Sequence, residues 1–149
     1  MATIRLPPDF KDFLRLLNSE GVEYLLVGGY AVGYYGYPRA TGDMDIWIGI
    51  GQENASALVR VLREFGFRST PLSSDMFLAE KQVIRMGFPP VRIDLITTVS
   101  GVQFADCYVR RTVATIDGVP VNVVSVEDLK TNKKSAGRTK DLADLENLP

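Results

Sequence analysis

Short apolar runs bounded by turn residues alternate along this chain with segments of helical periodicity, and this alternation constrains the fold more than any other feature. Apolar side chains recur at helical spacing in residues 10–17 and 55–65. The short apolar runs at residues 24–27 and 44–50 are typical of strands. The order of these elements predicts an α/β (α+β) fold in which a mixed β-sheet is flanked by α-helices.

Two strand pairs are predicted in the second half of the chain. The first joins residues 82–86 to residues 91–96 through a Gly-Phe-Pro-Pro link. The second joins residues 111–116 to residues 119–124 through Asp117-Gly118, a dipeptide that favours type I′ turns. Each pair is therefore expected to form a β-hairpin.

Two further helices are predicted after the second hairpin. Ser125, with an aspartate three residues later, resembles a capping box and opens a helix that Gly137 is expected to end. Residues 139–148 are expected to form the last helix. Asp141 and Asp144 lie near its start, where acids interact favourably with the helix dipole, so we expect them to have no role in chemistry.

The composition excludes several classes of function. Of the side chains, 17 are basic and 18 acidic, and the net charge of −1 argues against a general binder of nucleic-acid backbones. There is no histidine, which excludes histidine-based zinc sites, Ser-His-Asp triads and Cys-His dyads. The single Cys107 cannot form an internal disulfide, and no run is apolar enough to span a membrane. We expect one domain, residues 1–149, in the cytoplasm, with no membrane partner.

Two acids lie on one strand of the predicted sheet. Alternate side chains of a strand share a face, so Asp43 and Asp45 project together while Met44 and Ile46 project to the other side. Like charges this close repel each other unless a cation lies between them, and carboxylate oxygens are the ligands that Mg²⁺ prefers. The alternative is a solvated strand face, although aspartate is disfavoured in strands.

Asp94 is a third acid inside an apolar strand, where Ile93 and Leu95 point to the opposite face. By itself, an aspartate at a strand end more often caps or faces solvent. Three acids on two strands could, however, hold one or two metal ions roughly 3.5–4 Å apart, an arrangement that clamps the attacking and leaving oxygens in phosphoryl-type transfer. We therefore expect the strands of Asp43 and Asp94 to be neighbours.

Gly28-Gly29 lies between a predicted strand and a predicted helix. A turn with so little side-chain bulk lets backbone N–H groups and the helix N-terminus approach phosphate oxygens. The alternative is a turn that only needs a positive φ. The spacing of the later glycines, Gly33 and Gly36, does not match the dinucleotide-binding fingerprint, and no Walker sequence follows.

Three cations are candidates for contacts with phosphate. Lys133 falls on the apolar side of its predicted helix, so its ammonium either reaches solvent or points into an acidic, phosphate-filled cleft. Arg39 precedes the strand of Asp43, and Arg138 follows the helix of Lys133. Each arginine either contacts a triphosphate or the substrate, or remains solvated.

These residues resemble the nucleotidyltransferase superfamily, which has the DNA polymerase beta-like fold. Its pattern is a hydrophobic residue with Gly-Gly or Gly-Ser, then Asp-x-Asp or Asp-x-Glu, then a later carboxylate. Here the pattern is Val27-Gly28-Gly29, Asp43-Met44-Asp45 and Asp94. The context at residues 28–41 and the tail at residues 127–142 are similar to the bacterial branch that includes type IV toxin-antitoxin nucleotidyltransferases.

The resemblance implies a two-metal transfer core in a nucleotidyltransferase-like fold. Its metal ligands would be Asp43, Asp45 and Asp94, and Lys133 would lie near the phosphates. The implied nucleotide-binding residues are Gly28, Gly29, Arg39, Thr41 and Arg138. Relatives often carry histidine where Tyr35 stands, and longer ones add a C-terminal helical region.

The sequence thus predicts a nucleotidyltransferase that uses Mg²⁺, with Mn²⁺ as a substitute, to move a nucleoside monophosphate from a nucleoside triphosphate to an acceptor hydroxyl. The acceptor is left open among proteins, RNA and small molecules, and the resemblance adds an antitoxin as a partner. One alternative is a nucleotide-binding module with little or no catalysis. The other is an oligomerising or interaction protein that exposes the aromatic residues Tyr30, Tyr34, Tyr35 and Tyr37, which would otherwise pack in the core.

Overall fold

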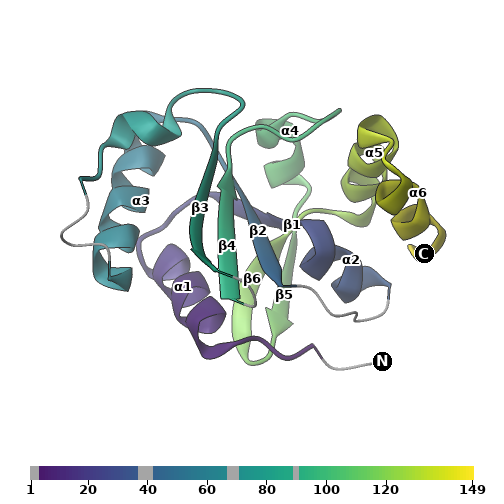
Figure 1. The fold of residues 1–149 in the computed structure, drawn as a ribbon, viewed down its shortest axis with the longest axis horizontal. Helices are drawn as coiled ribbons and strands as arrows, with labels where there is room; N and C mark the ends of the chain where they lie inside the picture. Colours follow the sequence, from purple (N-terminus) through teal and green to yellow (C-terminus); the bar gives the residue numbers. More distant parts are fainter. Residues whose placement is uncertain (1–3, 37–41, 67–70, 89–90) are drawn as a thin grey trace.

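The computed structural model describes residues 4–36, 42–66, 71–88 and 91–149, which form a six-stranded β-sheet with helices on both faces (Figure 1). The helices are α1 (Pro8–Ser19), α2 (Gly28–Tyr35), α3 (Gln52–Phe65), the short 3₁₀ helix η1 (Ser74–Phe77), α4 (Phe104–Val109), α5 (Val126–Ala136) and α6 (Thr139–Glu146). The strands are β1 (Tyr24–Val27), β2 (Asp43–Ile48), β3 (Val83–Phe88), β4 (Val91–Ile96), β5 (Thr112–Ile116) and β6 (Val119–Val123). The predicted fold class is confirmed.

The sheet is mixed, with the strand order β3-β4-β2-β1-β6-β5. β2 is antiparallel to β1 and parallel to β4, while β1 is parallel to β6. The predicted hairpins, β3–β4 and β5–β6, are antiparallel and form the two ends of the sheet. The parallel pairing of β2 with β4 confirms that the strands of Asp43 and Asp94 are neighbours.

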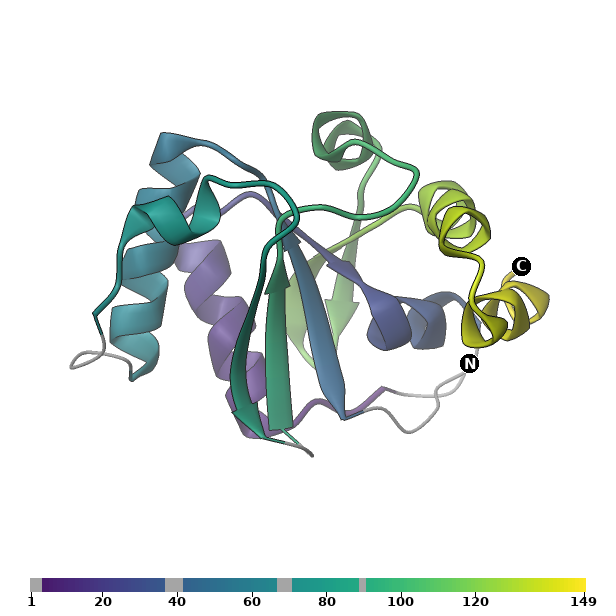
Figure 2. The same ribbon diagram turned by 45° about the horizontal axis from the view of Figure 1, so that its top comes forward.

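The helices lie in two groups. α1 and α3 cover one face of the sheet, and α2 lies on the other face with α5 and α6 beyond it (Figures 1 and 2). The alternation along β2 explains this arrangement, because Met44, Ile46 and Ile48 are fully buried on the side of α1 and α3. Asp43 and Asp45 point to the opposite side, so one face of β2 builds the core and the other is left for a site.

The local backbone follows the predicted turn and cap chemistry. Asp117 and Gly118 have φ values of 48° and 80°, as a type I′ turn requires at both central positions. The Ser125 hydroxyl accepts a hydrogen bond from the Asp128 N–H at 3.1 Å and so caps α5. Gly137 ends α5 with a left-handed φ of 67°.

Two short elements, η1 and α4, are absent from the sequence prediction. Each spans only four to six residues, too few for an apolar periodicity to distinguish a helix from a loop. Tyr30 is buried, and Tyr34 and Tyr35 pack against the core, whereas Tyr37 lies outside the described residues. Within the described ranges, no helix is long and apolar enough to cross a membrane.

Candidate active site

The three predicted acids lie on one face of adjoining strands. In the parallel β2–β4 register, Asp45 lies directly opposite Asp94, and Asp43 lies opposite Arg92. Asp43 and Asp45 are half-buried, and Asp94 is only 5% exposed. We call this set, Asp43, Asp45, Asp94 and Arg92, the acidic wall.

The carboxyl group of Asp45 has a strongly raised pKa. Its pKa rises from 3.8 to about 6, chiefly because burial penalises its charged form, and then because Asp94 and Asp43 repel it. Lys140 and Arg92 act in the opposite direction and lower this pKa. A cation that binds beside Asp45 would therefore stabilise its ionised form.

Arg92 already partly neutralises the acidic wall. Its Nη2 atom lies 2.6 Å from Asp43 Oδ2 and donates to Asp94 Oδ2 at 3.2 Å. Its Nε atom lies 3.2 Å from Asp94 Oδ1, yet both of these buried atoms lack a hydrogen bond of good geometry. Arg85 is more distant, at 3.8 Å from Asp94, and its side chain is largely exposed. The guanidinium of Arg92 thus spans Asp43 and Asp94.

Gly28 makes room for Asp45 at the start of α2. Its φ of +69° is in the left-handed region that favours glycine, and a Cβ added there would collide with Asp45 Oδ2. β1 brings the two residues together, because Val27 pairs with Asp45 across the β1–β2 ladder. The predicted glycine turn is therefore built against the acidic wall, beside the N–H groups at the N-terminus of α2.

The opposite side of the site is a charged cluster on α5 and α6. The ammonium of Lys133, a residue only 5% exposed, lies 3.1 Å from Asp141 Oδ1 and 3.1 Å from Asp144 Oδ2. Asp141 also accepts from Arg138, at 2.7 Å from Nε and at 3.2 Å from the backbone N–H. We call Lys133, Arg138, Asp141 and Asp144 the helical wall.

Hydrogen bonds shift the pKa values of Asp141 and Arg138 in the helical wall. Burial by itself would raise the pKa of Asp141, but hydrogen bonds from Arg138 and Lys133 outweigh it and hold that pKa below its ordinary value. The hydrogen bond to Asp141 likewise raises the pKa of Arg138. Our expectation that Asp141 only caps α6 was too narrow, because its carboxylate also links Lys133 to Arg138.

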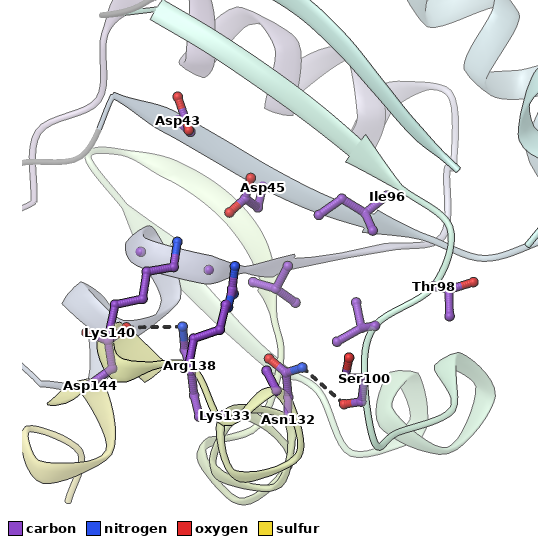
Figure 3. Close-up of a pocket in the computed structure, with 15 residues that line it drawn as sticks. Asp43, Asp45, Ile96, Thr98, Ser100, Asn132, Lys133, Arg138, Lys140 and Asp144 are labelled. Carbon is purple, nitrogen blue, oxygen red and sulfur yellow. Dashed lines mark hydrogen bonds and ion pairs between the residues drawn. The ribbon is translucent and has the colours of Figure 1, made fainter. Parts of the chain in front are cut away.

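A cavity of about 570 Å³ separates the two walls. Figure 3 shows Asp43 and Asp45 on one side, with Lys133, Arg138 and Lys140 across from them. Its lining residues are Val27, Gly28, Gly29, Asp43, Asp45, Ile96, Thr98, Val99, Ser100, Asn132, Lys133, Ala136, Arg138, Lys140 and Asp144. The cavity combines an acidic strand face, a glycine turn at a helix N-terminus and a set of cations.

Most predicted site residues converge here. Asp43, Asp45, Gly28 and Gly29 line the cavity, as do Lys133 and Arg138, and Asp94 lies beside Asp45 in the sheet. Arg39 and Thr41 lie outside the described residues, so their predicted nucleotide contacts stay predictions.

Two charged residues of the site, Arg92 and Lys140, were not predicted from the sequence. Arg92 is two residues from Asp94 on the same strand, so the alternation rule alone places it on the acidic face. Lys140 reaches the cavity because α6 folds back beside α5, and no sequence pattern signals that turn. Within the described ranges, no group of three acidic or cysteine side chains is spaced to hold a metal ion.

Comparisons with known proteins agree with this architecture. A family model described as "Nucleotidyl transferase of unknown function (DUF2204)" matches residues 8–149. A search of curated proteins gave no match.

Several solved structures share the fold. A candidate nucleotidyltransferase from Thermotoga maritima is 16% identical, with a TM-score of 0.60, and the match covers 92% of this chain and 88% of that one. The lincosamide antibiotic adenylyltransferase LnuA, solved with lincomycin bound, is 12% identical with a TM-score of 0.56 and 95% coverage of both chains. An antigenic nucleotidyltransferase-like protein from Paracoccidioides brasiliensis is 20% identical, with a TM-score of 0.55 and coverage of 93% and 72%.

The family match extends over nearly the whole chain, and the fold of these neighbours agrees with it. The chain belongs to the nucleotidyl transferase family DUF2204, within the nucleotidyltransferase superfamily.

Proposed function

We propose that this chain moves a nucleoside monophosphate from a nucleoside triphosphate to an acceptor hydroxyl, using Mg²⁺ held by Asp43, Asp45 and Asp94. The observation that carries the proposal is the pairing of Asp45 with Asp94 across β2 and β4, on the face that borders the cavity. Family membership supports nucleotidyl transfer as the class of reaction.

The donor chemistry of the acidic wall fits a divalent metal, although within the described ranges the three carboxylates are not spaced to hold one and Arg92 contacts Asp43 and Asp94. All three candidate ligands are carboxylates, which supply the hard oxygen atoms that Mg²⁺ and Mn²⁺ prefer. Asp94 Oδ1 is buried with no hydrogen bond of good geometry, although Arg92 Nε lies 3.2 Å away, and burial followed by repulsion from Asp94 and Asp43 raises the pKa of Asp45. The guanidinium of Arg92 already bridges two of the three acids, so this cluster is stabilised by a nearby positive charge. A bound metal would supply charge neutralisation at the α-phosphate and orient its oxygens.

The residues of the two walls would bind the phosphates and accept the proton of the acceptor hydroxyl. The acceptor oxygen attacks the α-phosphorus, the bond from that phosphorus to the bridging oxygen breaks, and pyrophosphate leaves. Asp94, which lies beside Asp45 in the sheet, would take the proton of the acceptor hydroxyl. Gly28 and Gly29 would present the N-terminal N–H groups of α2 to phosphate oxygens.

The helical wall would hold the phosphates from the other side. Arg138 lines the cavity with a side chain that is 63% exposed, so its guanidinium is accessible to a ligand while Asp141 anchors Nε. Lys133 would act chiefly by fixing Asp141, because its ammonium contacts two carboxylates. Arg39 and Thr41 complete the proposed nucleotide-binding set from the sequence alone.

The acceptor is proposed more broadly, as a hydroxyl of a protein, an RNA or a small molecule. LnuA is an adenylyltransferase of lincosamide antibiotics, which supports including small hydroxyl compounds among the acceptors to be screened. The toxin-antitoxin role, with an antitoxin as partner, rests on the sequence resemblance and stays a prediction.

The test is a transfer assay with the four α-³²P-labelled nucleoside triphosphates. Wild type, Asp45→Asn and the control Asp106→Asn, an exposed acid on α4, are incubated with Mg²⁺ or Mn²⁺ and each acceptor class. Labelled product is expected with wild type and Asp106→Asn, and only with metal. Equal labelling by Asp45→Asn, or labelling in excess EDTA, would overturn the proposed mechanism.

A nucleotide-binding module without turnover is the second candidate, because Arg92 contacts both Asp43 and Asp94. In that case the chain would bind a nucleoside triphosphate and raise its melting temperature, but no acceptor would be labelled. Turnover with any acceptor excludes this candidate.

A further inference from the structure

Three cations line the cavity from the helical side, and they differ in what they already contact. Lys133 is buried between Asp141 and Asp144, and both of its ion pairs are 3.1 Å long. Arg138 shares Asp141 with Lys133. The positive charges of these two residues are thus matched by two carboxylates within the wall itself.

Lys140 is placed differently. It lines the same cavity from the first turn of α6, and it is solvent-exposed. Among the described residues, no ion pair joins it to a carboxylate, and its charge acts on Asp45, whose pKa it lowers. Figure 3 shows its ammonium directed across the cavity towards the strand of Asp43 and Asp45.

We propose that Lys140 is the residue that directly binds the polyphosphate chain of the nucleotide, while Lys133 is a positioning residue that holds Asp141 and, through it, Arg138. This inference rests on the proposed function, and it changes the assignment of the phosphate-binding lysine within that site.

Electrostatics distinguishes the two lysines. A polyphosphate would have to draw Lys133 away from two buried carboxylates, and breaking buried ion pairs is strongly unfavourable. Lys140 has no such contacts to break, and a compact ammonium on a flexible stem suits phosphate oxygens. A metal bound at Asp45 would neutralise that carboxylate, so Lys140 would be attracted less to Asp45 and more to the phosphates.

The position of Lys140 also fits a polyphosphate chain that runs across the cavity from the acidic wall to α6. Gly28 and Gly29 lie on the same cavity, at the N-terminus of α2. A polyphosphate that extends from the acidic wall towards α6 would have the N–H groups of α2 on one side and Lys140 with Arg138 on the other. Each of these groups donates to phosphate oxygens.

The experiment measures binding of inorganic tripolyphosphate by calorimetry, with and without Mg²⁺. This probe has no nucleoside and no transferable group, so the result is independent of turnover. Lys140→Met is compared with wild type, with Lys140→Arg, and with the control Lys134→Met, an exposed lysine of α5 outside the cavity. Lys140→Met is expected to weaken binding about tenfold, and the loss should shrink at high salt. Lys140→Arg should restore most of the affinity, and Lys134→Met should stay within about twofold of wild type.

Lys133 is tested separately, with Lys133→Met and the double variant Lys133→Met/Lys140→Met. For every variant that folds, as judged by circular dichroism, Lys133→Met should weaken tripolyphosphate binding less than Lys140→Met. If Lys133→Met does not fold, the comparison of Lys140→Met with Lys134→Met decides the proposal.

The outcomes separate this inference from the proposed function. Unchanged binding by Lys140→Met overturns the inference, as does a wild type that does not bind tripolyphosphate. Binding that depends on Lys140 in a chain that labels no acceptor supports the inference and overturns transfer. A transfer assay in which Lys140→Met keeps the wild-type KM for the nucleotide overturns the inference and leaves transfer intact.

Discussion

The acidic wall and the helical wall face each other across one cavity, yet they differ in how far their charges are balanced. On β2 and β4, Arg92 contacts Asp43 and Asp94, the more distant Arg85 lies 3.8 Å from Asp94, and the pKa of Asp45 is raised to about 6. On α5 and α6, two cations and two carboxylates are closely paired, and the pKa of Asp141 is lowered. A wall with excess negative charge is suited to bind a cation, whereas a balanced wall stabilises the fold.

This difference predicts that substitutions in the two walls have opposite consequences. A change to a carboxylate of the acidic wall should abolish activity and preserve stability. A change in the helical wall should cost stability first. Charge balance is thus a guide to which buried ionic cluster of a protein serves function and which serves the fold.

The largest effect is expected for Lys133→Met. It leaves Asp141 and Asp144 buried without their shared cation, so the free energy of unfolding should fall by about 3–5 kcal/mol, measured by urea denaturation. Lys134→Met on the same helix is the control and should change it by less than about 0.5 kcal/mol. A loss below about 1 kcal/mol for Lys133→Met would contradict the structural role of the helical wall.

Asp45→Asn should show the reverse pattern. Transfer activity should drop more than about 100-fold, beyond the loss typical of residues that only support a metal ligand. The free energy of unfolding of the metal-free protein should stay the same or rise, because a carboxylate that Asp94 and Asp43 repel is removed. A variant that loses stability along with activity would remove the distinction between the walls.

Arg92→Gln should have a moderate effect on metal binding. The change removes the cation that spans Asp43 and Asp94, so Mn²⁺ affinity measured by electron paramagnetic resonance should rise by up to about tenfold. Arg85→Gln is the matched control, because that side chain is largely exposed and more distant from Asp94. If Mn²⁺ binds Arg92→Gln more weakly than wild type, Arg92 supports the metal site instead of competing with the metal.

The smallest effect concerns the pH dependence of stability without metal. Asp45 has a folded pKa above its unfolded value, so its charged form destabilises the fold at neutral pH and this cost is relieved as the pH falls through about 6. Asp141 has a lowered pKa, so its contribution is complete above its unfolded pKa and is lost as the pH falls further.

In EDTA, the melting temperature of wild type should therefore rise between pH 7 and pH 5 and then fall. A rise of about 2–4 °C corresponds to about 1 kcal/mol in a domain of this size. Asp45→Asn should lack the rise and keep the fall. A monotonic fall in wild type would show that the acidic wall carries no excess charge in solution.

The acidic wall could be predicted from sequence because strand alternation is a local rule. It places Asp43 with Asp45 whatever the rest of the fold does, and the apolar runs around Asp94 make its strand recognisable. The same rule also places Arg92 on this face, two residues before Asp94.

The helical wall depends on a tertiary contact that no local pattern encodes. Helical periodicity indicates that Lys133 faces inward, but its partners lie on a second helix beyond Gly137. Whether α6 folds back onto α5 is decided by the turn and by packing, so Asp141 and Asp144 resemble ordinary helix-start acids in the sequence. The position of Lys140 at the cavity depends on the same contact between α5 and α6, so no local pattern predicts it.

The parallel pairing of β2 with β4 also bears on how the protein acquires its site. Asp45 and Asp94 meet only after the β3–β4 hairpin has docked beside β2, across a long intervening stretch of chain that includes α3. Such a non-local contact forms slowly compared with a hairpin or a helix. The β1–β2 half of the sheet can assemble before it, with two of the acids in place and the third absent. During refolding, metal affinity should therefore appear together with hairpin docking. The time course of metal binding would then report the rate of that step.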